Sequence, residues 1–155
     1  MRSKTKIWII ALLIPLAVGA LSALITRNSM EDFSNLAQPP LSPPGGLFPV
    51  VWTILFLLMG IGSALVYFSE TPVQGKALKV YFAQLVVNFF WSIIFFNLDA
   101  RLFALAWILL LLFLVIWMIL LFHKARPLAA YLQIPYLLWL LFATYLNAGV
   151  WYLNR

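Results

Sequence analysis

The sequence predicts an all-α membrane protein, a single domain built as a bundle of five transmembrane helices. Hydrophobic residues make up 65% of the chain and charged residues only 9%, whereas soluble domains are roughly half apolar and a quarter charged. The charged residues also leave five uncharged runs, each holding the roughly 20 residues that a helix needs to cross a bilayer core. Membrane-spanning strands would show alternation over about ten residues instead, and the sequence has no such alternation.

The five expected helices follow these runs, and one long loop separates the first helix from the second. Lysine and arginine residues fall seven to three in favour of the face that holds the N-terminus, and cytoplasmic segments carry the excess of such residues. We therefore predict the N-terminus inside, the C-terminus outside and, from the same pattern, a bacterial plasma membrane. The expected helices span about 7–25, 48–69, 80–98, 102–122 and 128–153, the loop is 28–47, and helix 102–122 is expected to be the most exposed to lipid.

The charge and the reactive residues exclude several classes of function. The net charge is +6, but the basic residues are scattered over short loops, so we expect membrane lipids and no nucleic acid as a partner. There is no cysteine, and the only histidine, His123, falls at the inner end of helix 102–122. The spans contain no nucleophile with a base, no carboxylate pair and no metal cluster. We therefore predict no cofactor, no metal and no conventional catalytic site.

Helix 80–98 carries an unusual polar stripe. Gln84, Asn88, Trp91 and Ser92 fall with Phe95 on one face about 100° wide. A carboxamide in hydrocarbon costs several kcal/mol unless it finds a partner. This stripe should therefore face protein or a ligand.

Helices 48–69 and 128–153 carry similar stripes, and these stripes overlap in membrane depth with the stripe on helix 80–98. At 1.5 Å per residue, Asn88 and Ala143 lie roughly 15 Å, and Asn147 roughly 9 Å, below the outer end of their helices. We predict a pocket between the helices for a large, flat, mostly apolar molecule. The alternative is that the aromatic residues pack the bundle and the amides join helices. The candidate pocket residues are Trp52, Phe56, Gln84, Asn88, Trp91, Trp139, Phe142, Ala143 and Asn147.

The long loop changes character along its length. Its first part is polar, whereas its second part is rich in proline, which favours a stiff, extended path. Connections of this length are commonly lids or binding loops. We expect Pro43, Pro44 and Phe48 to form a lid over the pocket, and the alternative is a rigid strap with no ligand.

These positions carry a family pattern, and the chain resembles the translocator proteins, also called tryptophan-rich sensory proteins or peripheral benzodiazepine receptors. The resemblance covers nearly the whole chain. It departs from the family at Gly46, where many members have an aromatic residue, and at Phe56, where many have Tyr, so a polar contact to a ligand is missing. The matching residues are Pro43-Pro44, Phe48 with Val51-Trp52, Met59-Gly60, Gln84 with Asn88, Trp91-Ser92, Phe95-Phe96, and Pro135 with Trp139, Phe142-Ala143 and Leu146-Asn147.

The resemblance implies a homodimer whose pocket binds porphyrins of the protoporphyrin IX type and benzodiazepine-type ligands, as a receptor, sensor or carrier. One alternative is light-dependent porphyrin breakdown, with Trp52 or Trp139 as the catalytic candidates. Another is a small-molecule transporter that is not coupled to an ion gradient. Ion coupling needs ionisable groups within the membrane, and the predicted spans contain none. Val150, Tyr152 and Arg155 also match a loose cholesterol-contact pattern, although an aromatic and a basic residue are expected at any helix end.

Overall fold

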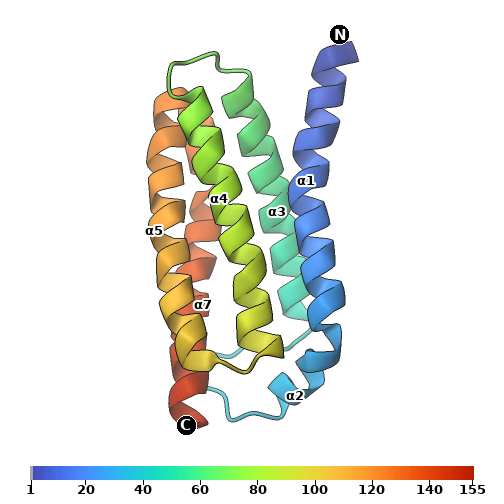
Figure 1. Ribbon diagram of the computed structural model, residues 1–155, viewed down its shortest axis with the longest axis vertical. Helices are drawn as coiled ribbons and strands as arrows, with labels where there is room; N and C mark the ends of the chain where they lie inside the picture. The colour runs from blue at the N-terminus through green and yellow to red at the C-terminus, as the bar shows by residue number, and fades with distance from the viewer. Residues whose placement is uncertain (1) are drawn as a thin grey trace.

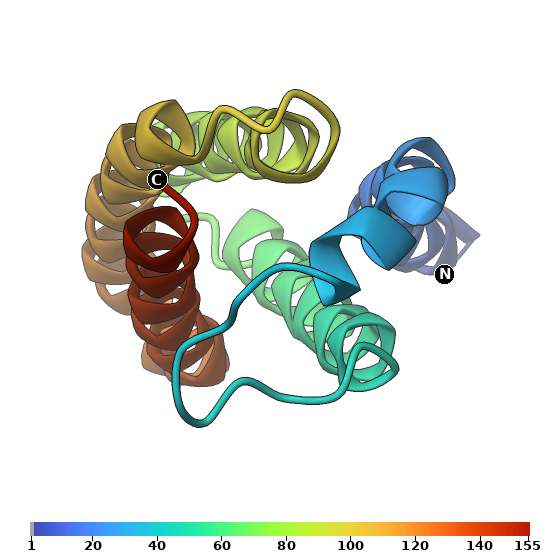
Figure 2. The ribbon, with the colours of Figure 1, turned by 90° about the horizontal axis from the view of Figure 1, so that it is seen from below.

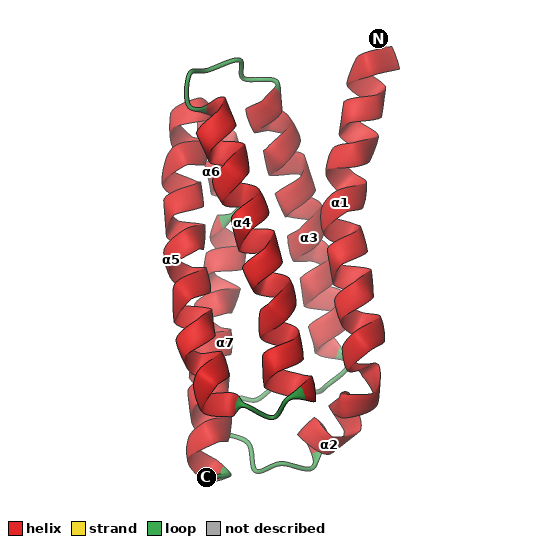
Figure 3. Ribbon diagram, viewed as in Figure 1, coloured by secondary structure: helices red, strands yellow, loops and turns green. Residues whose placement is uncertain are grey.

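The computed structural model describes residues 2–155, and every regular element within them is helical. Within these described residues, five segments are long and apolar enough to cross a membrane, which confirms the predicted all-α, five-span class (Figures 1 and 3). The elements are α1 (Arg2–Thr26), the 3-10 helix η1 (Arg27–Ser29), α2 (Met30–Ser34), α3 (Leu47–Tyr67), α4 (Gln74–Ser92), the π-helix η2 (Ile93–Asn97), α5 (Arg101–Ala125), α6 (Pro127–Tyr131) and α7 (Ile134–Leu153).

The long helices run side by side, and the two termini lie at opposite ends of the bundle (Figure 1). One end holds α2, the connection 35–46, the turn 98–100 and the C-terminus, and we call it the loop end. Seen from this end, α1 packs beside α3, α4 beside α5, and α7 beside α5 (Figure 2). Which end faces the cytoplasm stays a prediction of the charge pattern.

Helix α1 is the most exposed span, so the expectation that helix 102–122 would be so is wrong. In the apolar 18-residue stretch of this first span, only 17% of the residues are buried, against 33% in the corresponding stretch of α5. The reason is that α5 packs against α4, α6 and α7, whereas α1 packs chiefly against α3. This α1–α3 contact is close because Gly60 has no side chain: a Cβ there would lie 2.7 Å from the carbonyl oxygen of Ala11.

The expected helix 128–153 is divided into α6 and α7 by a turn at residues 132–133. Pro135 occupies the first turn of α7, where its missing N–H leaves no helical hydrogen bond unmade. The side chain of Gln133, fully buried, donates to the carbonyl oxygen of Leu58 over 3.0 Å. This bond ties the turn to α3, where Gly62 leaves room for the amide group.

Helix α4 begins six residues before the expected start of helix 80–98. Lys76 and Lys79 lie in its first two turns and are exposed. An uncharged run therefore underestimates the length of a helix that extends beyond the bilayer core. At the loop end the helix continues as the wider π turn of η2. That turn carries Phe95 and Phe96, which line the cavity described below.

Candidate functional site

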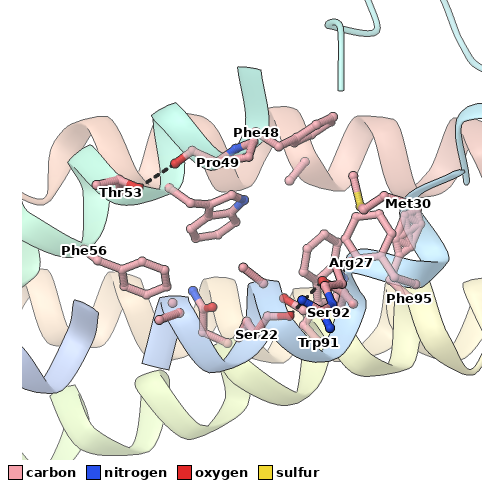
Figure 4. A pocket seen from close by; sticks show the side chains of 18 of the residues that line it. Ser22, Arg27, Met30, Phe48, Pro49, Thr53, Phe56, Trp91, Ser92 and Phe95 are labelled. Carbon is pink, nitrogen blue, oxygen red and sulfur yellow. Dashed lines mark hydrogen bonds between the residues drawn. The ribbon is translucent and has the colours of Figure 1, made fainter. Parts of the chain in front are cut away.

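A cavity of about 550 Å³ lies between α1, α3, α4 and α7 toward the loop end (Figure 4). Its volume falls within the range of roughly 300–1,000 Å³ that is typical of small-molecule sites. Most of the described residues in its wall are apolar or aromatic, and the others supply four hydroxyl groups, one amide and one guanidinium. The cavity is therefore the natural candidate for a binding site.

The structure brings most of the predicted pocket residues to this one space. Trp52 comes from α3, Asn88 from α4 and Trp139 from α7, so three helices contribute as the depth argument predicts. The ring centroids of Trp52 and Phe56 are 5.6 Å apart in a stacked arrangement. The predicted residues that line the cavity are Trp52, Phe56, Asn88, Trp91, Trp139 and Ala143, with Phe48 from the expected lid.

Gln84, Phe142 and Asn147 lie outside the lining, as do Pro43 and Pro44 of the expected lid. Gln84 and Asn147 are fully buried and bonded to other side chains. Phe142 lines a separate, open groove of about 400 Å³ between α3 and α7, and Trp139 forms a wall of both spaces. The two amides therefore support the cavity from behind.

A hydrogen-bonded chain joins α4 to α7 beside the cavity. The amide nitrogen of Asn88 donates to the hydroxyl of Tyr136 over 2.7 Å, and that hydroxyl donates to the side-chain oxygen of Gln84, also over 2.7 Å. All three side chains are buried. Tyr136 is not among the predicted pocket residues, although it lies three residues before Trp139 and so on the same helical face.

A second polar link fixes the position of Trp91. Its indole N–H donates to Oδ1 of Asn147 over 3.1 Å, and the amide nitrogen of Asn147 donates to the carbonyl oxygen of Arg101 over 2.9 Å. Asn147 thus connects α4, α5 and α7. These contacts explain why a polar side chain occurs at this position of the largely apolar helix α7.

Helix α1 supplies a wall of the cavity that the sequence analysis missed. Gly19 allows the ring of Phe56 to come close, since a Cβ at Gly19 would lie 2.7 Å from that ring. Gly19 and Ala23 form a small-residue pattern that is typical of plain helix packing, so the sequence gives no sign of a cavity wall there. The α1 residues of the lining are Leu16, Gly19, Ala20, Ser22, Ala23 and Thr26.

Aromatic residues close the cavity at the loop end. Phe33 of α2 is buried, and its ring centroid lies 5.5 Å from that of Phe95 and 5.1 Å from that of Phe96, both edge to face. The ring centroid of Phe48 lies 6.3 Å from that of Phe33 and 5.9 Å from that of Trp139. The closing residues therefore come from α2, η2 and the start of α3, and Phe48 alone of the expected lid residues takes part.

The connection 35–46 is fastened to α7. The hydroxyl of Tyr145 donates to the carbonyl oxygen of Pro40 over 2.7 Å, and Asn154 exchanges two hydrogen bonds with the backbone of Ala37. Gly149 lets the ring of Pro39 approach α7. The connection is therefore anchored to α7 through Ala37, Pro39 and Pro40.

The three residues of the cholesterol-contact pattern do not share one environment. Val150 is fully buried, whereas Tyr152 is exposed and the guanidinium of Arg155 lies 4.3 Å from the centroid of its ring. The pattern thus does not form one lipid-facing surface.

The fold and cavity define an integral, multi-pass membrane protein with an internal space of ligand size. The TspO/MBR family model matches residues 11–153, and the chain belongs to that family. It is 36% identical to a translocator protein homolog from Schizosaccharomyces pombe, over 98% of this chain and 94% of the relative. It is 32% identical to a tryptophan-rich protein TspO from Archaeoglobus fulgidus, over 93% and 94%, and 33% identical to a translocator protein from Bos taurus, over 92% and 87%. The resemblance inferred from the motifs is confirmed.

Proposed function

We propose that the protein is a membrane receptor, sensor or carrier that binds a porphyrin of the protoporphyrin IX type, or a similar flat apolar molecule, in the cavity between α1, α3, α4 and α7. One observation carries the proposal: Trp52, Trp91 and Trp139 reach the same cavity from three different helices. Indole rings offer broad apolar faces against which an aromatic macrocycle can stack.

The volume of the cavity favours this function over simple aromatic packing. Protein interiors are close-packed and hold few voids larger than a water molecule. If the aromatic side chains served only to join helices, they would fill the space between them, yet about 550 Å³ lies open to a guest. At the loop end, the contacting rings of Phe33, Phe48, Phe95 and Phe96 form this part of the cavity wall.

The proposal is tested by titrating the detergent-solubilised protein with protoporphyrin IX and following the porphyrin absorbance. We expect Asn88→Ala and Trp139→Phe each to weaken binding several-fold. Trp117→Phe is the matched control, because Trp117 lies on α5, is 36% exposed and is absent from the cavity wall. Equal affinity in all four proteins would remove these residues from the site.

Light-dependent breakdown of the bound porphyrin is a second candidate function. Its support is that Trp52 and Trp139 both line the cavity, so an excited porphyrin bound there would lie against an electron-rich indole.

We further propose a homodimer in a bacterial plasma membrane, on the strength of the family resemblance and of the charge pattern. The exposed apolar side chains of α1, such as Leu13, Leu21 and Leu24, offer area for lipid or for a second copy. Cross-linking of the protein in its native membrane, at increasing dilution in lipid, distinguishes a dimer from random collision.

A further inference from the structure

Arg27, in η1 at the loop end, is the one charged residue among the described residues that line the cavity (Figure 4). It contributes a guanidinium, and none of these described lining residues carries a carboxylate. Within residues 2–155, the ion pair that the structure shows is that of Arg101 with Asp99, and no carboxylate lies within 4.0 Å of Arg27. A cation beside an apolar cavity favours an anionic group on the guest.

A second polar group of the wall also lacks a partner. Ser22 is 9% exposed, and its hydroxyl oxygen is buried without a hydrogen bond. Buried hydroxyls in helices normally bond to a backbone carbonyl one turn earlier. Thr26 does so, donating to the carbonyl oxygen of Ser22 over 2.8 Å, and Ser63 does so with Gly60 over 2.9 Å. The free hydroxyl of Ser22 is thus an exception, and it lies on the cavity wall.

The unpartnered polar groups of the described residues that line the cavity can all act as hydrogen-bond donors. The indole N–H of Trp139 is buried without a partner as well, and it can only donate. A guanidinium also only donates, and a serine hydroxyl can donate. A guest that satisfies Arg27 and Ser22 must therefore present acceptors, and the acceptor beside Arg27 is best matched by an anion.

We propose that Arg27 and Ser22 form a carboxylate subsite, which selects tetrapyrroles that carry a free carboxylic acid over their neutral esters. This inference rests on the proposed function and specifies the end of the porphyrin that faces the loop end. The guanidinium binds the carboxylate, and Ser22, five residues and roughly 7 Å deeper along α1, donates a second hydrogen bond to it. The macrocycle then extends toward Trp52 and Trp139.

The experiment compares protoporphyrin IX with its dimethyl ester, which keeps the macrocycle and removes both charges. Affinities of the two compounds are measured by absorbance titration in the wild type, Arg27→Gln, Ser22→Ala and Arg126→Gln. The last variant is the matched control, since it makes the same charge change at an exposed residue between α5 and α6. This connection lies at the end of the bundle opposite the loop end (Figure 1). For each variant, the affinity for the acid is divided by the affinity for the ester. Comparing this ratio between variants removes the effect of the different partitioning of the two compounds into detergent.

We expect Arg27→Gln to lower the affinity for the acid about tenfold, as for a hydrogen bond to a charged group reduced by solvent screening, and to leave the ester unchanged. Ser22→Ala should lower it two- to threefold, and Arg126→Gln should have no effect. Unchanged ester binding also shows that a variant is folded. The same acid-to-ester ratio in the wild type and Arg27→Gln would overturn the subsite while leaving porphyrin binding intact. Failure of both compounds to bind the wild type would overturn the proposed function together with the subsite.

Discussion

Trp91 on α4 donates its indole hydrogen to Oδ1 of Asn147 on α7 over 3.1 Å. Asn147 is fully buried and also donates to the first residue of α5. One amide therefore fixes the position of an indole in the cavity wall and holds three spans together. The shape of the cavity depends on polar contacts that lie behind its lining.

Replacement of Asn147 by Ala is expected to destabilise the protein and to weaken ligand binding. It removes two hydrogen bonds between helices, and such bonds in membrane proteins contribute about 0.6 to 1.7 kcal/mol each. We expect a loss of about 1–2 kcal/mol in the free energy of unfolding, measured by denaturant titration in detergent. The exposed Asn28 offers a control, Asn28→Ala, and an equal loss in both variants would contradict the assignment.

Removal of the Tyr136 hydroxyl by Tyr136→Phe is expected to cost about 1–2 kcal/mol, because it leaves Gln84 and Asn88 without their common partner. The effects of Tyr136→Phe and Gln84→Leu should not be additive, since the two residues share one bond. The free energies of unfolding of the two single variants and the double variant measure this coupling. A coupling of zero would show that the bond between the two side chains contributes nothing.

Gly149→Ala is expected to release the connection 35–46 from α7. A Cβ at Gly149 would lie 2.6 Å from the ring of Pro39, whereas a Cβ at Gly45 would meet nothing within 4 Å. We therefore expect faster proteolysis of the loop and faster porphyrin dissociation in Gly149→Ala, and wild-type behaviour in Gly45→Ala. Equal rates in both variants would argue that the loop does not control access.

If the pocket indoles take part in light-dependent breakdown, the double variant Trp52→Phe/Trp139→Phe should lose bound porphyrin under illumination at least several-fold more slowly than the wild type. The measurement is the decay of porphyrin absorbance at saturating protein, with a dark sample as reference. The Trp117→Phe variant controls for loss of an indole elsewhere. An unchanged decay rate would exclude these two tryptophans from the photochemistry.

The sequence predicted the span number and one side of the cavity because polarity within hydrocarbon is informative. Asn88, Trp52 and Trp139 are costly or unusual at mid-depth, and the structure places them around one space. The sequence could not reveal the wall that α1 contributes, since small residues such as Gly19 and Ala23 suit helix packing and cavity formation equally well. Nor could it separate Asn88 in the wall from Gln84 and Asn147 behind it, because all three share the chemistry of buried amides and differ only in which neighbour they meet.

The break at residues 132–133 and the closure by α2 were equally hidden. Pro135 indicates a disturbed helix, but a kink and a full break have the same sequence signature. Phe33 lies in a short polar segment, where its role depends on contacts with Phe48, Phe95 and Phe96, which are distant in the sequence.

The most direct measurement is an experimental structure of the protein with protoporphyrin IX bound. We predict that the macrocycle lies between α1, α3, α4 and α7, against Trp52, Trp91 and Trp139, with one carboxylate at Arg27. Density for the porphyrin in the open groove beside Phe142, or on the lipid-facing surface, with the cavity filled by side chains, would contradict the account.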